Sequence, residues 1–124
     1  MVRRLCVSHD GGGETKEMRK PNIKEIHLLE YLIRQNDVHL PNGWQDELMV
    51  EDMDDGGMGS LTLYPPIYSA ERAFGRQVSE YQFLDKDMTP VIATLYVDKQ
   101  EHLFELDIWK VDYSPLLSLP DIQL

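Results

Sequence analysis

The sequence has little cysteine, no long apolar run and few bases. Cys6 is the only cysteine, which excludes an internal disulfide and a site built from several cysteines, and which fits a reducing cytosol. No apolar run approaches the roughly 20 residues that a membrane span needs. The first six residues are partly basic but have no apolar segment after them, so no secretory signal is expected. These absences predict a cytoplasmic protein without a membrane anchor.

The shortage of bases gives the chain a strong negative charge. It has 12 Lys and Arg against 22 Asp and Glu, a net charge of −10 and a pI near 4.7. Residues 1–34 hold seven bases and five acids, whereas residues 35–124 hold five bases and 17 acids, a balance of −12. Nucleic-acid binding usually depends on Lys and Arg pairing with phosphates, so this charge argues against it. A basic protein is the expected class of partner.

The length and composition indicate one domain. A chain of 124 residues with 42% hydrophobic residues can bury a core without disulfides or metals. Residues 1–17 contain Gly11-Gly12-Gly13 and little periodicity, so they are expected to form a flexible leader. We expect Met18 to be the natural start and residues 18–124 to form a single α+β domain.

The first periodic segment predicts an amphipathic helix from Asn22 to about Asn36. Asn22 is a good N-cap, and Glu25 follows at the spacing of a capping box. The apolar residues recur at helical spacing on one side of this segment: Ile23, Ile26, Leu29, Leu32 and Ile33. Such a helix is expected to pack one face on a sheet.

The remainder predicts strands separated by turns. Alternating or β-favouring residues occur at 48–51, 61–64, 78–84, 91–97 and 104–109. The connections between successive strands are short, which favours antiparallel pairing over crossovers. The expected fold is α+β, with one main N-terminal amphipathic helix on a roughly five-stranded, mainly antiparallel sheet.

No catalytic, cofactor-binding or metal-binding residue is predicted. The glycine-rich segment 55–60 lacks the Lys of a phosphate-binding loop and does not lead from a strand into a helix, so a turn explains it better. The acids of 46–55 lack the spacing of an EF-hand, and the four histidines are not spaced as metal ligands. Cys6 has no recognisable nucleophile context.

An acidic and aromatic surface is the strongest candidate for a site. On a strand, Glu105 and Asp107 share a face with Trp109 and would place two carboxylates beside a large aromatic ring. Aromatic residues are over-represented among interface anchors. We therefore predict a partner-binding surface made of Asp52, Asp54, Asp55, Glu105, Asp107 and Trp109.

Three segments together resemble a known family. They are Asp55-Gly56-Gly57-Met58-Gly59-Ser60-Leu61, Ala93-Thr94-Leu95-Tyr96-Val97-Asp98 and the run from Leu103 to Asp112, followed by Ser114-Pro115-Leu116. With these segments the chain is similar, over roughly Met18 to Pro120, to an uncharacterised family of small bacterial proteins carried as a domain of unknown function. The resemblance implies a bacterial, cytoplasmic, single-domain protein and no particular activity.

The leading functional hypothesis is a non-enzymatic interaction protein, such as an immunity or inhibitor protein that neutralises a basic partner. Acidic surfaces accelerate encounters with basic proteins through long-range attraction. A small carboxylate- or metal-dependent hydrolase is the first alternative. A homo-oligomeric structural protein is the second alternative.

Overall fold

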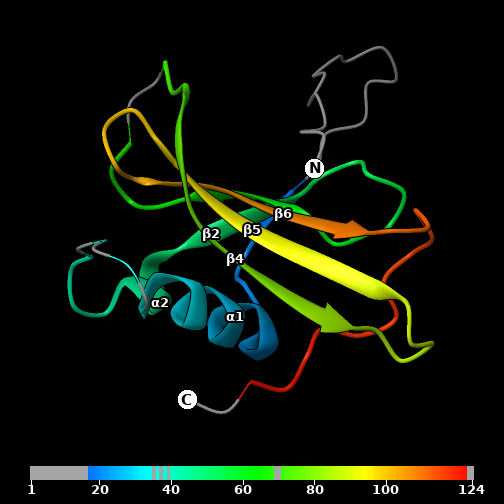
Figure 1. Ribbon diagram of the computed structural model, residues 1–124. Coiled ribbons are helices and arrows are strands. Elements are labelled where there is room, and N and C mark those ends of the chain that lie inside the picture. The colour runs from blue at the N-terminus through cyan, green and yellow to red at the C-terminus, as the bar shows by residue number, and fades with distance from the viewer. Residues whose placement is uncertain (1–16, 35, 37, 39, 69–70, 123–124) are drawn as a thin grey trace.

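The computed structural model describes residues 17–34, 36, 38, 40–68 and 71–122. The predicted leader, residues 1–17, lies outside this part except for Glu17. A twisted antiparallel sheet forms the centre of the domain (Figure 1). Its elements follow the chain as β1 (Met18–Arg19), α1 (Ile23–Arg34), α2 (Trp44–Glu47), β2 (Met49–Asp52), β3 (Leu61–Tyr64), β4 (Phe74–Leu84), β5 (Pro90–Asp98) and β6 (Leu103–Lys110).

The sheet confirms the α+β class and corrects the number of elements. Its strand order is β1-β2-β3-β6-β5-β4, so the sheet has six strands where about five were expected. The unexpected strand, β1, has two residues and is too short to show an alternating pattern. Among the described residues there are two helices where one main helix was expected, because the four residues of α2 form a single turn that periodicity cannot reveal.

The beginning of α1 confirms the predicted capping box. The Glu25 N–H donates to Asn22 Oδ1 at 2.9 Å, and the Asn22 N–H donates to Glu25 Oε1 at 2.8 Å. Glu25 also accepts two hydrogen bonds from the Arg19 guanidinium, each 2.9 Å long. The cap therefore ties the helix to β1 as well as satisfying two backbone donors.

The core lies between α1 and one face of the sheet. The apolar side of α1 contributes Leu28, Leu29 and Leu32, all at most 1% exposed. The strands contribute most of the other fully buried side chains, among them Val50, Leu61, Leu63, Leu95, Leu106 and Ile108. Burying this much apolar surface is the main source of stability for a domain of this size.

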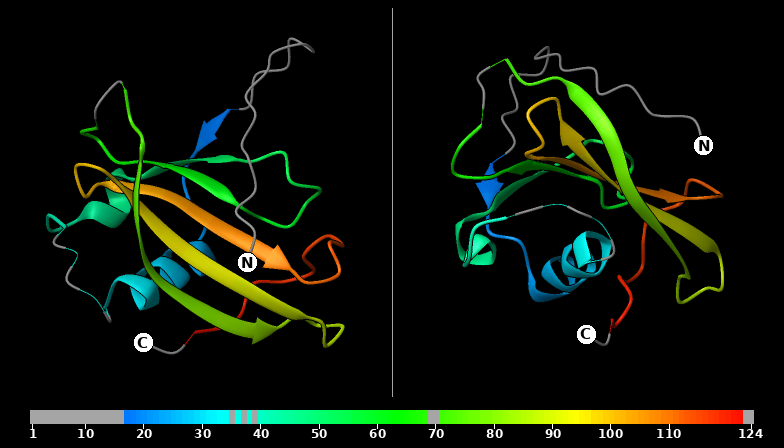
Figure 2. Two further views of the ribbon diagram at one scale, coloured as in Figure 1. Left: turned by 45° about the horizontal axis from the view of Figure 1, so that its top comes forward. Right: turned by 60° about the vertical axis from the view of Figure 1, so that its left-hand side comes forward.

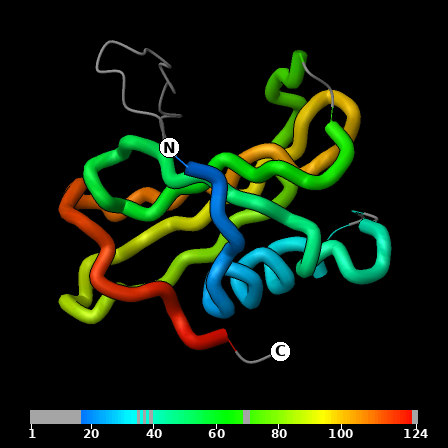
Figure 3. Tube along the Cα trace, turned by 180° about the vertical axis from the view of Figure 1, so that it is seen from behind, coloured from blue at the N-terminus to red at the C-terminus, as the bar shows by residue number. Residues whose placement is uncertain are grey.

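Residues 115–122, here named the C-terminal strap, cross the same face of the sheet as α1. Figure 3 shows this segment descending from the end of β6 towards the start of α1. Its side chains Leu116, Leu119 and Ile122 pack against the core. Its backbone is held to the loop before β3, where the Leu116 N–H donates to the Gly57 carbonyl at 3.0 Å.

Neither helix of the described residues is long and apolar enough to cross a membrane. The longer of the two, α1, has 12 residues and carries charged side chains.

Candidate functional site

The two faces of the sheet differ in what lies over them. Figures 1 and 2 show α1, α2 and the C-terminal strap on one side. The opposite side is here named the open face, and no helix or strap among the described residues covers it. Strand register assigns to this face the side chains of Glu51, Thr62, Tyr64, Glu80, Thr94, Tyr96, Glu105, Asp107 and Trp109.

The alternation predicted for 104–109 is confirmed, and it places three predicted site residues together on the open face. Glu105, Asp107 and Trp109 occupy successive open-face positions of β6. Glu105 is 5% exposed and Asp107 is 4% exposed. The hydroxyl of Ser60, just before β3, accepts from the Ile108 N–H at 2.8 Å and lies within donating distance of the Ile108 carbonyl, at 3.2 Å, and of Asp107 Oδ1, at 3.4 Å. Two carboxylates therefore lie almost wholly out of water beside an indole ring.

Two polar atoms next to these carboxylates have no hydrogen-bond partner. Thr94 lies directly opposite Asp107 across the β5–β6 ladder, is 1% exposed, and leaves its Oγ1 unsatisfied. The indole Nε1 of Trp109 is likewise buried without an acceptor. Buried polar groups in folded proteins are nearly always hydrogen-bonded, so this pair marks an unusual location.

Another open-face contact joins β2 to β3. The Tyr64 hydroxyl donates to Glu51 Oε1 at 2.9 Å. Burial of the phenol and this hydrogen bond to a carboxylate together raise the pKa of Tyr64 to about 12. Four of the described acids have side chains on the open face: Glu51, Glu80, Glu105 and Asp107.

The structure places the other three predicted residues elsewhere. Asp52 alternates with Glu51 and so points to the covered side, where it accepts from the Arg19 guanidinium at 2.9 and 3.1 Å. Asp54 is exposed in the loop between β2 and β3. Asp55 is 9% exposed and accepts from the N–H groups of Met58 and Ser60, which fixes the conformation of the glycine-rich loop.

Sequence reasoning missed a buried ion cluster below the strap. The Lys110 ammonium is 2.8 Å from Asp85 Oδ2 and 2.9 Å from Asp87 Oδ2, and it donates to the Pro115 carbonyl at 3.2 Å. Asp85 also accepts from the N–H groups of Leu117 and Ser118 at 2.8 and 3.1 Å. The signal in the sequence was Lys110 itself. It is a base at an inward-facing position of β6, whereas the neighbouring inward-facing positions are occupied by Leu106 and Ile108.

A second missed cluster closes the β5–β6 turn. Asp98 is fully buried, accepts from the N–H groups of Gln100 and His102 at 2.9 Å, and has Arg72 Nε 3.4 Å from its Oδ2. The Arg72 guanidinium donates to the carbonyls of Leu63 and Leu103 at the ends of two strands. The cluster compensates its own charge and therefore has a structural role.

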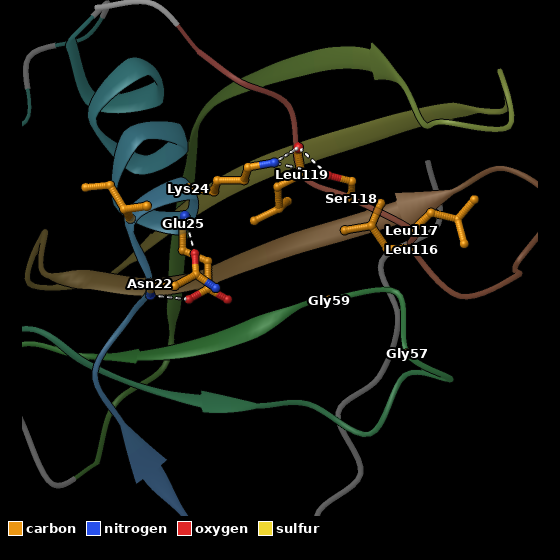
Figure 4. Close-up of a pocket in the computed structure, with 10 residues that line it drawn as sticks. Asn22, Lys24, Glu25, Gly57, Gly59, Leu116, Leu117, Ser118 and Leu119 are labelled. Carbon is orange, nitrogen blue, oxygen red and sulfur yellow. Dashed lines mark hydrogen bonds between the residues drawn. The ribbon is translucent and has the colours of Figure 1, made fainter.

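Figure 4 shows a pocket between the start of α1, the glycine-rich loop and the strap. Its volume is about 480 Å³. Lys24 reaches across it and donates to Ser118 Oγ at 3.2 Å and to the Leu119 carbonyl at 3.4 Å. The polar groups that line the pocket bind one another, so they anchor the strap to the helix.

No three His, Cys, Asp or Glu side chains of the described residues are grouped so that they could hold a metal ion. The open face brings together two carboxylates, a hydroxyl and an aromatic ring on neighbouring strands.

Comparison with known proteins gives a family without an assigned activity. No curated protein and no solved structure matches the chain. Residues 18–120 match a family model described as a domain of unknown function, DUF6984. The match covers most of the chain and nearly all of the described residues, and the chain belongs to this family.

Proposed function

We propose that the protein is a cytoplasmic, non-enzymatic interaction module that binds a basic protein partner, in the manner of an immunity or inhibitor protein. The observation that carries this proposal is the pair of buried carboxylates, Glu105 and Asp107, aligned with Trp109 on the open face. Carboxylates beside an aromatic ring suit the Lys and Arg side chains of a basic surface.

The charge of the whole chain supports the same partner class. Residues 35–124 carry 17 acids against five bases, so the field around the domain attracts basic proteins from a distance. Near contact, desolvated charge pairs and aromatic anchors at the centre of an interface usually supply most of the affinity. The open face combines both features.

The test is a capture experiment from the source cell with three baits. They are the wild type, the open-face variant Glu105→Gln/Asp107→Asn, and the control variant Asp46→Asn/Glu47→Gln, which removes the same charge from exposed positions on α2. The captured protein is then purified, and its affinity for each bait is measured by calorimetry at several salt concentrations.

We expect the wild type and the α2 control to retain the same basic protein, and the open-face variant to lose it. The affinity of the wild type should fall with added salt, because screening weakens charge attraction. Circular dichroism checks that the open-face variant is folded. Equal affinity of the folded open-face variant and the wild type would contradict the proposal.

A further inference from the structure

The strand β4 forms one outer edge of the sheet. It pairs with β5 on one side, and no other strand of the described residues pairs with it. It has 11 residues, which is about twice the usual length of a strand. Figure 1 shows it beside β5 as the last strand of the sheet. An edge strand presents backbone N–H and C=O groups that can pair with a further strand.

The hydrogen bonds at the turn between β4 and β5 determine which backbone groups point outwards. The Asp85 N–H donates to the Thr89 carbonyl at 2.9 Å, so these two residues are hydrogen-bonded across the hairpin. Hydrogen-bonded and non-hydrogen-bonded pairs alternate along an antiparallel ladder. The N–H and C=O groups of three residues in β4 therefore point away from β5: Glu80, Gln82 and Leu84.

The features that usually protect an edge strand are confined to the first half of β4. The register is irregular at 74–76 and at 77–79, and such bulges hinder the pairing of a further strand. Over 79–84 the register is regular, and the sequence contains neither lysine nor proline. The second half of β4 is therefore a regular edge without the usual obstacles to pairing.

The helix α1 contacts this half of β4 through the covered face of the sheet. The Tyr31 and Tyr81 ring centroids are 4.8 Å apart, and the Ser79 hydroxyl donates to the Leu32 carbonyl at 2.7 Å. Backbone hydrogen-bonding groups lie in the plane of the sheet, whereas side chains project from its two faces. These contacts therefore leave the outward backbone groups of β4 available.

We propose that residues 79–84 pair antiparallel with the same residues of a second copy of this chain, across a two-fold axis at Gln82. Gln82 then faces Gln82 of the second copy, and Glu80 faces Leu84 in both directions. Each of these pairs exchanges two backbone hydrogen bonds. The two six-stranded sheets become one continuous sheet. This inference concerns the edge of the sheet and does not rest on the basic partner proposed above.

The charges near this edge are complementary in the proposed register. Glu80 lies diagonally across from Lys86 of the second copy, and both side chains are exposed. Diagonal neighbours in a sheet are within reach of long side chains, so the two-fold axis generates two such contacts between opposite charges. The two Glu80 residues lie four positions apart, roughly 13–14 Å along the strands. That separation exceeds the distance of about 8 Å over which physiological salt screens charge.

The covered side of the same segment is aromatic. Tyr81 faces Phe83 of the second copy, and Phe83 faces its Tyr81. Both residues are half-buried, and their ring centroids are 6.0 Å apart within one chain. Aromatic cross-strand pairs stabilise antiparallel sheets, so the interface extends this stack across the two-fold axis.

Other symmetric registers fit less well. An axis at Glu80 places the two Glu80 carboxylates directly opposite each other, which destabilises a sheet. An axis at Tyr81 makes the two Glu80 residues diagonal neighbours and places Leu84 opposite the irregular segment 77–79 of the second copy. The axis at Gln82 avoids both faults and uses every outward group of the regular segment.

The experiment is sedimentation velocity of the full-length protein from micromolar to millimolar concentration. A reducing agent keeps Cys6 from joining two chains. We expect the wild type to show a monomer–dimer equilibrium and Gln82→Pro, which lacks the central N–H, to remain monomeric. Gln82→Thr is the matched control, because it keeps that N–H and should still form the dimer. Circular dichroism checks that Gln82→Pro is folded, as expected for proline at an outward position of an edge strand.

Charge reversal gives a second test that does not depend on proline. Glu80→Lys and Lys86→Glu each replace two attractions by repulsions, and each should raise the dimer dissociation constant roughly tenfold. The combined variant Glu80→Lys/Lys86→Glu restores opposite charges and should regain the wild-type dissociation constant.

Three outcomes would overturn the inference. The first is a wild type that stays monomeric up to millimolar concentration. The second is a dimer that persists in folded Gln82→Pro and is unaffected by either single charge reversal. The third is a dimer that both single reversals weaken and the combined variant does not restore, which would exclude the register centred on Gln82.

Discussion

Lys110 and Asp85 form a fully buried ion pair in which the ammonium nitrogen is 2.8 Å from a carboxylate oxygen. Lys110 ends β6 and Asp85 directly follows β4, so the pair joins the end of β6 to the β4–β5 turn. Asp85 also accepts hydrogen bonds from the backbone N–H groups of Leu117 and Ser118. The pair is therefore one of the contacts that hold the C-terminal strap, together with those from Gly57 and Lys24.

Removing the cation should destabilise the domain strongly. Lys110→Met leaves Asp85 as a buried carboxylate without its counter-charge, and we expect the melting temperature to fall by about 10 °C or more. Arg76→Gln is the matched control, because it breaks a pair with Glu101 that is about half exposed. That change should lower the melting temperature by less than about 3 °C. A similar fall in the melting temperatures of the two variants, measured by calorimetry, would show that the buried pair stabilises the domain no more than the exposed pair does.

The same carboxylate should make the domain sensitive to acid. Burial opposes the ionisation of Asp85, but hydrogen bonds from Leu117, Lys110, Lys86 and Ser118 outweigh it and lower its pKa from 3.8 to about 2. A depressed pKa stabilises the fold above about pH 4, and this contribution is lost as the pH falls towards 2.

Asp85→Asn tests this acid sensitivity, because it removes one ionisable group and leaves the other carboxylates in place. Urea unfolding of the wild type should shift to lower urea between pH 4 and pH 2 more steeply than unfolding of the variant. Parallel pH profiles for the two proteins would contradict the assignment to Asp85.

Gly57 should tolerate a side chain less well than Gly43. Both have positive φ, 84° and 81°, so alanine at either position costs roughly 1–2 kcal/mol in backbone conformation. A Cβ on Gly57 would also lie 3.3 Å from Pro115 Cβ in the strap, whereas one on Gly43 meets nothing within 4 Å. We expect Gly57→Ala to lose more free energy of unfolding than Gly43→Ala in urea titrations.

Hydrogen exchange gives a second measure of this contact between the glycine-rich loop and the strap. The Leu116 amide donates to the Gly57 carbonyl, so it should exchange faster in Gly57→Ala and at an unchanged rate in Gly43→Ala. If Gly57→Ala and Gly43→Ala have equal unfolding free energies and equal Leu116 exchange rates, close packing of the strap against Gly57 is excluded.

Tyr64 should ionise at unusually high pH. Its pKa is about 12 in place of 10, because burial and the hydrogen bond to Glu51 both favour the neutral phenol. The raised pKa stabilises the fold below about pH 10, and this contribution disappears as the pH rises through 12. Ultraviolet titration should show a late tyrosinate step that Tyr64→Phe removes and Glu51→Gln moves to lower pH. A titration curve unchanged by Glu51→Gln would exclude the carboxylate as a cause.

The extent of agreement between sequence and structure differs by element. The capping box of Asn22 and Glu25 and the alternation of β6 were both predictable, because each depends on residues within a few positions of one another. β1 was not predictable, since two residues carry no period and only its pairing with β2 makes it a strand.

For the candidate site, too, features that depend on neighbouring residues were predictable and those that depend on strand pairing were not. Local alternation was enough to predict that Glu105, Asp107 and Trp109 share a face. Thr94 could not be added, because it lies beside Asp107 only through the pairing of β5 with β6. Asp52 and Asp55 looked equivalent to the other acids in sequence. In the structure Asp52 binds Arg19 and Asp55 binds loop N–H groups, so both lie away from Glu105 and Asp107.

The sequence by itself determined the negative charge, the helix with its cap, and the alternating faces of β6. These properties follow from composition and from the 3.6- and 2-residue periods of the backbone. Tertiary structure alone decided the strand order, the burial of Lys110 with Asp85, and the meeting of Thr94 with Asp107. Those contacts join residues 13 and 25 positions apart, whose proximity depends on the packing of the whole sheet and not on any local preference.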